Sequence, residues 1–281
     1  MAIIGAILGD IAGSPFEFKH SYMSLVTRRE DCDLTLFDKH QNYYATDDTI
    51  MSIATMEALE TDGDFAKSYR RYGNRYPDMT YGVRFRNWLE NPHMPAYNSL
   101  GNGSAMRVAY CADKFEDLSD VTNAAQNSAI VTHNHPEGVE GAVVTATCIY
   151  MAKHGYSKDE ILNYAISQYP SSDYRYGCDK PLSAYKNEVQ YSETCMDSVP
   201  IAIRCFYESE NFIDCCRKII SMPIDTDTIC AIAGPMCEEF YGNCLGSKEA
   251  DEEMVRKFLP DYLIEKLEEY GVFEQKGLDR E

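Results

Sequence analysis

The chain of 281 residues has little positive charge. Its 26 lysines and arginines stand against 45 aspartates and glutamates, which gives a formal net charge of −19. Anionic partners such as nucleic acids and acidic membranes need a basic face. We therefore expect neither a nucleic-acid nor a membrane partner. The excess of carboxylates fits a solvated surface, and it also attracts cations.

Long hydrophobic runs and paired cysteine motifs are missing as well. The apolar stretch from Met1 to Leu8 is too short to span a membrane, lacks the basic flank of a signal peptide, and is interrupted by Asp10. The eleven cysteines include no C-x-x-C pair, which argues against a zinc or disulfide framework and favours reduced thiols in a core. Reduced thiols in turn predict a cytoplasmic location.

Neither a low-complexity linker nor a repeat divides the chain, so we predict one domain over residues 1–281. Helical patterns dominate, and strand-like alternation is found only weakly at 186–191, which predicts an all-α fold. Long polar loops at 31–45, 91–103 and 170–197 are typical of functional segments. The expected helices are 50–59, 138–154, 199–208 with Ser198 as N-cap, 212–221 with Asn211 as N-cap, 229–241, and one between Pro260 and Gly271.

Two acidic motifs of similar composition lie where apolar helices begin. One is residues 46–49 (TDDT), and the other is residues 225–228 (DTDT). Either motif alone is explained by helix capping, because Thr and Asp are preferred caps and carboxylates favour the first turn. Four carboxylates brought together would repel one another unless a cation lay among them. Carboxylate and hydroxyl ligands suit Mg²⁺ or Mn²⁺ better than zinc.

Three further segments carry unusual polar groups. Residues 5–17 (GAILGDIAGSPFE) have glycines four apart, which permit close helix packing, and an aspartate that needs a partner or a cation if it is buried. Residues 101–107 (GNGSAMR) let the backbone approach a ligand such as a pyrophosphate. The two histidines of residues 132–136 (THNHP) are more typical of a polar turn ended by proline than of metal ligands.

Taken together and in this order, these segments resemble the ADP-ribosylglycohydrolase family, which includes the dinitrogenase-reductase-activating glycohydrolase. The similarity extends over residues 1 to about 242, which leaves 243–281 as a helical extension. The resemblance implies an all-α fold around two Mg²⁺ or Mn²⁺ ions. It also implies hydrolysis of the glycosidic bond between ADP-ribose and an acceptor, either a protein or a small molecule. The matching stretches are residues 5–17, 45–49, 97–107, 132–138 and 225–234.

The resemblance also implies roles for single residues. Cleavage at the anomeric carbon builds oxocarbenium-like charge, and a carboxylate must move a proton to or from water or the leaving group. The catalytic carboxylates implied are Glu17 and Asp47. The metal ligands implied are Thr46, Asp47, Asp48, Asp225, Asp227 and Thr228. The contacts to ADP-ribose implied are Asp10, Gly101, Asn102, Gly103, Ser104, Met106 and His133.

The last acidic motif departs from the family pattern. The family places two glycines immediately before it, where this chain has Pro223 and Ile224, and Pro235 lies within the helix that follows. Both replacements restrict the backbone and Pro235 favours a kink, so an altered geometry of the motif is expected. This departure leaves open an ADP-ribose-binding protein with weak or no turnover. The acidic motifs alone would also permit a metal-dependent nucleotide phosphohydrolase.

Overall fold

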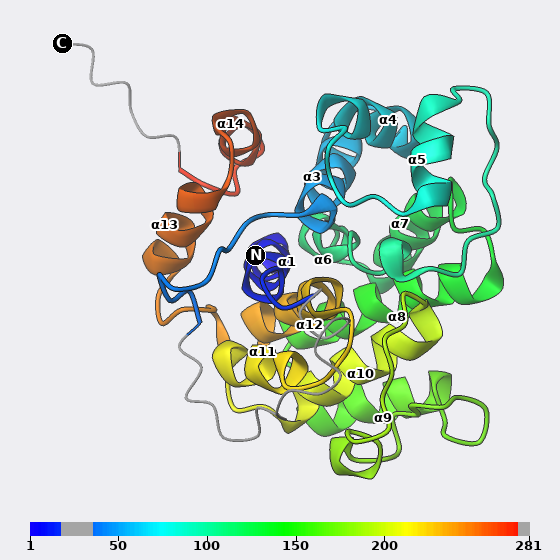
Figure 1. The fold of residues 1–281 in the computed structure, drawn as a ribbon, viewed down its shortest axis with the longest axis vertical. Helices are drawn as coiled ribbons and strands as arrows, with labels where there is room; N and C mark the ends of the chain where they lie inside the picture. The colour runs from blue at the N-terminus through cyan, green and yellow to red at the C-terminus, as the bar shows by residue number, and fades with distance from the viewer. Residues whose placement is uncertain (18–35, 275–281) are drawn as a thin grey trace.

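The computed structural model describes residues 1–17 and 36–274, and the regular structure in these ranges is helical (Figure 1). The prediction of an all-α fold is therefore confirmed. In chain order the α-helices are α1 (Ala2–Gly13), α3 (Asp47–Glu60), α4 (Phe65–Arg75), α5 (Val83–Glu90), α6 (Ala109–Lys114), α7 (Leu118–Ile130), α8 (Pro136–Lys153), α9 (Lys158–Gln168), α10 (Cys195–Glu208), α11 (Phe212–Ile220), α12 (Thr226–Tyr241), α13 (Lys248–Phe258) and α14 (Asp261–Glu269). Two short 3₁₀ turns are η1 (Asn102–Ser104) and η2 (Leu182–Ala184).

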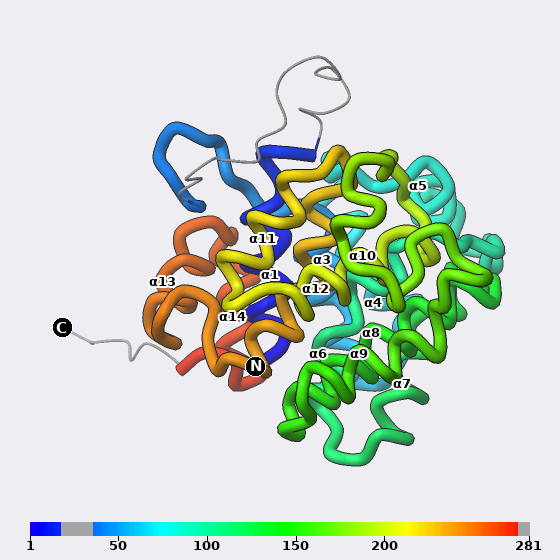
Figure 2. Tube along the Cα trace, turned by 90° about the horizontal axis from the view of Figure 1, so that it is seen from below, coloured from blue at the N-terminus to red at the C-terminus, as the bar shows by residue number. Residues whose placement is uncertain are grey.

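The centre of the molecule is the pair of helices α1 and α12, which lie side by side in Figures 1 and 2 with other helices around them. Glycines allow their backbones to touch. A Cβ atom at Gly5 would lie 2.4 Å from the carbonyl oxygen of Gly234, and one at Gly9 would lie 2.2 Å from that of Cys230. No side chain fits at such distances, so the packing role predicted for these glycines is confirmed. The helices run antiparallel, which brings the end of α1 to the start of α12.

The start of α3 is held against this pair. Thr46 is the N-cap, and its hydroxyl oxygen accepts a hydrogen bond of 3.2 Å from the backbone N–H of Asp48. The buried carboxylate of Asp10 in α1 also accepts the N–H groups of Thr46 and Thr49, at 2.9 and 3.1 Å. The acidic residues of both motifs therefore lie in the first turns of helices whose ends meet.

Helix boundaries agree with the sequence prediction where caps or glycines mark them. Asn211 caps α11 by accepting the N–H of Asp214 at 2.9 Å, and Gly271, at φ 72°, follows the last helix. The predicted N-cap at Ser198 is wrong, because α10 already begins at Cys195 after Thr194. Pro200 therefore lies inside this helix. Burial of one helix face stabilises the helix by more than the loss of one backbone hydrogen bond at the proline costs.

The weak strand expected at 186–191 is wrong, because these residues form turns and irregular loop. The side chains of Tyr185 and Val189 are buried four residues apart, so the segment is anchored to the core without the alternation that a strand needs. Among residues 1–17 and 36–274, the single isolated β-bridge joins Gly101 to Thr194.

The residues that depart from the family pattern adopt ordinary backbone. Neither Pro223 nor Ile224 has a positive φ, and Ile224 is buried with 1% of its surface exposed. Helix α12 continues through Pro235 from Thr226 to Tyr241. The start of α12 therefore keeps a helical geometry without the two glycines.

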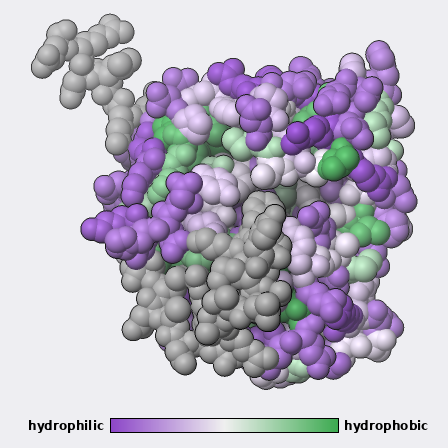
Figure 3. Space-filling view, viewed as in Figure 1, coloured by the Kyte–Doolittle hydropathy of each residue, from purple (hydrophilic) through white to green (hydrophobic). Residues whose placement is uncertain are grey.

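The cysteines and the surface follow the composition. Ten of the eleven cysteines lie in the described ranges, where all are free and buried, which confirms the prediction that they are core thiols; Cys32 lies outside these ranges. Figure 3 shows one face of the molecule, on which hydrophilic residues predominate. No helix within residues 1–17 and 36–274 combines the length and the apolar character that a membrane span requires.

Candidate active site

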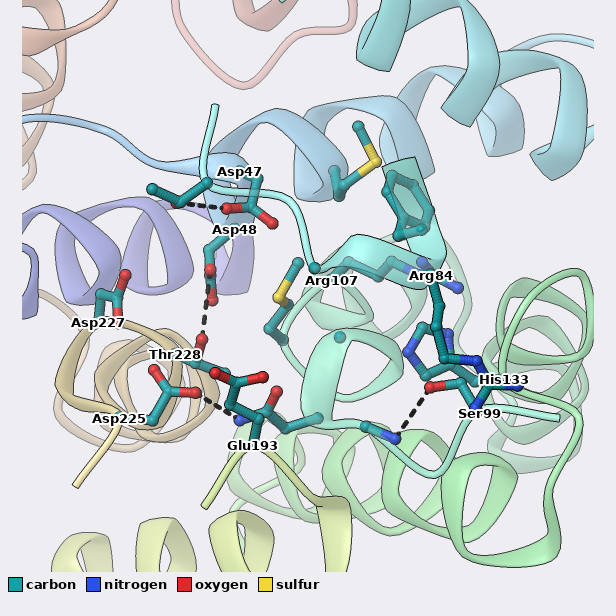
Figure 4. Close-up of a pocket in the computed structure, with 18 of the residues that line it drawn as sticks. Asp47, Asp48, Arg84, Ser99, Arg107, His133, Glu193, Asp225, Asp227 and Thr228 are labelled. Atoms are coloured by element: carbon teal, nitrogen blue, oxygen red, sulfur yellow. Dashed lines mark hydrogen bonds between the residues drawn. The ribbon is translucent and has the colours of Figure 1, made fainter. Parts of the chain in front are cut away.

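A cavity of about 390 Å³ lies between the starts of α3, α5 and α12, the η1 turn and the loop before α10 (Figure 4). This volume is within the range of small-molecule sites. All but three of the predicted site residues line it: Glu17, Asp47, Asp48, Gly101, Asn102, Gly103, Met106, His133, Asp225, Asp227 and Thr228.

One end of the cavity brings the two acidic motifs together. The hydroxyl of Thr228 donates a hydrogen bond of 3.3 Å to Asp48, although the two residues are 180 positions apart in sequence. Carboxylate oxygens of Asp10, Asp48 and Asp227 lie within 4.8 Å of one another, and so do those of Glu17, Asp225 and Asp227. Asp227 belongs to both groups, so the two three-carboxylate clusters share one residue.

These carboxylates lack compensating positive charge. No lysine or arginine of the described ranges forms an ion pair with them. Burial, followed by repulsion from neighbouring carboxylates, raises the pKa of Asp48 and Asp227 well above the ordinary range. Burial and the charge of Asp225 raise the pKa of Glu17 to about 8. Such a cluster is unstable as a set of bare anions.

Three oxygen atoms of this cluster point to what would compensate it. Oε2 of Glu17, Oδ1 of Asp48 and Oδ1 of Asp227 are buried and have no hydrogen-bond partner in the described part of the chain. Hard carboxylate oxygens are the ligands that Mg²⁺ and Mn²⁺ prefer. The residues present therefore fit divalent cations.

Three predicted site residues lie behind the cavity wall. Asp10 and Thr46 are buried, and Asp10 accepts the hydroxyl of Thr46 at 2.8 Å in addition to the backbone N–H groups at the start of α3. Ser104 donates its hydroxyl to the carbonyl oxygen of Gly138 at 2.6 Å. Asp10 thus helps to hold the start of α3 in place, and Ser104 helps to hold the glycine-containing turn η1 in place.

The glycine-containing turn η1 is tied to the acidic end. The side-chain amide of Asn102 donates to Asp225 at 2.8 Å and to Ser198 at 3.0 Å, and its backbone N–H donates to the carbonyl oxygen of Glu193 at 2.8 Å. A Cβ atom at Gly103 would lie 3.1 Å from Nε2 of His133, so the absence of a side chain lets the imidazole lie against the turn.

The opposite end of the cavity carries arginines. Arg84 is exposed at the start of α5, and Arg107 is buried with 1% of its surface exposed. The guanidinium of Arg107 lies 4.2 Å from the ring centre of Tyr69. Burial and the charges of the two arginines lower the pKa of His133 well below its ordinary value. In Figure 4 the labelled aspartates and the pair Arg84 and His133 lie on opposite sides.

Sequence reasoning misses part of the wall. Tyr191 and Glu193 belong to the long loop expected to be functional, and the Tyr191 hydroxyl donates to Glu193 at 3.1 Å and lies 3.5 Å from Glu17. Thr80, which donates to Asp47 at 2.8 Å, and Arg84 carry no motif in the sequence. Both residues lie just before or within α5. Tertiary packing brings this helix to the site, so no local motif marks them in the sequence.

The second histidine of the THNHP segment has a structural place. Nδ1 of His135 accepts the backbone N–H of Glu137 at 3.2 Å and caps α8, whose first residue is Pro136. The polar-turn interpretation therefore holds for His135, whereas His133 lines the cavity.

The sequence and the fold are those of a known hydrolase family. The sequence profile of the ADP-ribosylglycohydrolase family matches residues 1–269, so the chain belongs to this family, and the match includes α13 and α14. The chain is 26% identical to the human ADP-ribosylhydrolase ARH3 over 89% of each chain. It is 24% identical to the ADP-ribosylarginine hydrolase Tri1 of Pseudomonas putida (strain GB-1), covering 86% of this chain and 70% of that protein.

A solved structure of an ADP-ribosylglycohydrolase-related protein complex has the same fold. Its TM-score to this chain is 0.66 at 20% sequence identity, over 91% of this chain and 93% of that chain. The family resemblance inferred from the sequence motifs is thereby confirmed.

Proposed function

We propose that this chain hydrolyses the glycosidic bond between ADP-ribose and an acceptor, and that it uses two divalent ions, Mg²⁺ or Mn²⁺, to do so. The observation that carries the proposal is the meeting of residues 46–48 and 225–228 around three buried carboxylate oxygens that have no partner within residues 1–17 and 36–274. Membership of the family supports the reaction. Carboxylate oxygens of Asp227 lie within 4.8 Å of one from Asp48 and of ones from Glu17 and Asp225, which supports two ions over one.

The residues that would hold the ions are Asp47, Asp48, Asp225, Asp227 and Thr228, with Thr46 behind them. Thr46 contacts Asp48 with a hydroxyl-to-carboxylate distance of 3.2 Å. Divalent ions in this position would neutralise the carboxylates and supply Lewis-acid chemistry next to the ribose hydroxyls.

The polarity of the cavity orients the substrate. The pyrophosphate of ADP-ribose is anionic, so Arg84, at the end opposite the carboxylates, attracts it. The ribose that carries the scissile bond then faces Glu17 and the two acidic motifs. Tyr97 and Phe85 also line the cavity and supply aromatic rings for contact with the adenine.

Two carboxyl groups are placed to move a proton at the scissile bond. One oxygen of Glu17 has no hydrogen-bond partner among the described residues, and the other lies 3.5 Å from the Tyr191 hydroxyl. Asp47 is half-buried and is held by the hydroxyl of Thr80. Between them they can accept the proton of the attacking water and protonate the leaving atom.

The test is to incubate the chain with an ADP-ribosylated protein and Mg²⁺ and to identify the products by chromatography. The proposal predicts intact ADP-ribose, and no release in EDTA or with Asp47→Ala. Release of phosphate or AMP contradicts it and indicates a nucleotide phosphohydrolase. Tight ADP-ribose binding without turnover also contradicts it. Pro223 and Ile224 are the main reason to expect an inactive site, and neither has a positive φ.

A further inference from the structure

A chain of three polar side chains lies behind the arginine end of the cavity. The buried guanidinium of Arg107 donates from one nitrogen to the carbonyl oxygen of Ser128 at 2.8 Å and to the hydroxyl oxygen of Thr132 at 3.0 Å. That hydroxyl oxygen lies 2.8 Å from Nδ1 of His133. The chain therefore connects a buried cation to an imidazole that lines the cavity.

The direction of the first hydrogen bond follows from the donors available, and it permits one direction for the second that uses every donor. Arginine has N–H donors and no acceptor, so the Thr132 oxygen must accept from Arg107. The hydroxyl has a single proton, which is then free to be donated to Nδ1 of His133. A neutral imidazole with an accepting Nδ1 carries its own proton on Nε2. Burial and the charges of Arg107 and Arg84 lower the pKa of His133 well below its ordinary value, which favours the neutral ring.

The remaining nitrogen of this ring faces the ligand side. Nε2 has no hydrogen-bond partner among residues 1–17 and 36–274, and it lies against the turn where Gly101 and Gly103 have no side chain. A Cβ atom at these positions would lie 3.5 and 3.1 Å from Nε2. The glycines thus leave space for an incoming group beside an N–H donor.

We propose that Thr132 and Arg107 are positioning residues, which hold His133 as the neutral Nε2–H tautomer so that it donates a hydrogen bond to an acceptor atom of the ligand. A phosphate oxygen is the acceptor that fits this end, because Arg84 lies at the same end of the cavity. The opposite tautomer would turn a lone pair towards the phosphate and repel it. The identity of this ligand as ADP-ribose rests on the proposed function, whereas the tautomer itself does not.

The first experiment measures the tautomer directly. We would record long-range ¹H–¹⁵N NMR spectra of the full chain labelled with ¹⁵N-histidine, and assign His133 by its loss in His133→Gln. We expect the proton on Nε2 in the natural chain and in Thr132→Ser, which keeps the hydroxyl. In Thr132→Val we expect the proton to move, at least in part, to Nδ1. The matched control is Thr147→Val, because the buried Thr147 donates to the helix carbonyl of Val143 at 2.8 Å and does not line the cavity.

The second experiment measures the dissociation constant of ADP-ribose by calorimetry for the same variants. Loss of one well-placed hydrogen bond predicts about tenfold weaker binding for Thr132→Val, and little change for Thr132→Ser and Thr147→Val. A natural chain with its proton on Nδ1 overturns the proposal, and so does a Thr132→Val variant that keeps both the Nε2–H signal and the natural affinity. A chain that binds no ADP-ribose contradicts the proposed function, while the NMR result still decides the tautomer.

Discussion

The two ends of the cavity differ in the sign of their charged side chains and in how fully these side chains are hydrogen-bonded. At the carboxylate end, buried oxygens of Glu17, Asp48 and Asp227 have no partners in the part of the chain that the structure describes. At the arginine end, Arg107 donates to Ser128 and Thr132, and Arg84 donates to the carbonyl oxygen of Tyr97. The proposed cations would complete the first end, whereas hydrogen bonds hold the second end in place, where among the described residues Nε of Arg107 alone is buried without a partner.

The largest effect is expected from Asp227→Asn, because Asp227 is shared by both carboxylate groups. Release of ADP-ribose should fall at least about a hundredfold, which corresponds to about 3 kcal/mol in the activation barrier. In EDTA the same variant should unfold at a higher temperature than the natural chain, since it removes one of the mutually repelling buried charges. Product release measures the activity, and thermal unfolding in EDTA measures the melting temperature. Full activity, or a lower melting temperature in EDTA, would contradict the contrast between the two ends.

Addition of Mg²⁺ should affect the carboxylate end alone. A ligand present at about 100 times its dissociation constant stabilises the folded state by about 2.7 kcal/mol, which is a shift of several degrees for a chain of this size. We expect this shift in the natural chain and in Arg84→Ala, and its loss in Asp48→Asn. Thermal unfolding with and without Mg²⁺ checks this. An unchanged Mg²⁺ shift in Asp48→Asn would break the assignment.

Arg84→Ala should weaken ADP-ribose binding about tenfold, because it removes a charge-assisted contact to the pyrophosphate. Arg86→Ala is the matched control, since Arg86 lies two residues later in α5 and donates to the carbonyl oxygen of Met79 outside the cavity wall. Calorimetric titration with ADP-ribose measures both. Equal affinities for the two variants would show that the arginine end does not hold the anion.

The smallest effect is expected at Asp113, a half-buried residue outside the cavity whose carboxylate oxygens accept the N–H groups of Ala2 and Ile3 at 2.8 and 3.0 Å. Desolvation of the carboxyl group raises its pKa to about 6, above the value of about 3.9 in an unfolded chain. The protonated form therefore stabilises the fold fully below about pH 4, and this contribution is lost as the pH rises through about 6.

Asp113→Asn should accordingly reduce the loss of melting temperature between pH 4 and pH 7, by an equal amount with and without Mg²⁺. Thermal unfolding across this pH range is the measurement. A change that depends on Mg²⁺ would mean that Asp113 is coupled to the carboxylate end, so that this end could no longer be treated as the separate site of cation binding.

The carboxylate end is predictable from sequence because its parts are local motifs. Asp47 and Asp227 each lie in the first turn of an apolar helix, and four such carboxylates have few chemical uses apart from capping and cation binding. Their meeting depends on the glycine contacts between α1 and α12, which the spacing of Gly5 and Gly9 also indicates. Local sequence therefore carries both the ligands and part of the packing that joins them.

The arginine end is not predictable in the same way. Arg84 reaches the cavity because α5 packs against α4, and α4 against α3, so its position is a property of tertiary structure. The role of Thr132 depends on Arg107, which is 25 residues away and buried. The start of α10 differs from the prediction for a related reason: Ser198 is a residue type that favours caps, but its hydroxyl accepts the side-chain amide of Asn102 instead.

Anomalous diffraction from crystals of this chain grown with Mn²⁺ tests most directly whether the two acidic motifs form a binuclear metal site. We expect two manganese peaks, both bounded by Asp47, Asp48, Asp225 and Asp227 and both next to the cavity. No peak at this position, or manganese only at the separate cluster of Glu238, Cys244 and Asp251, would contradict the proposal.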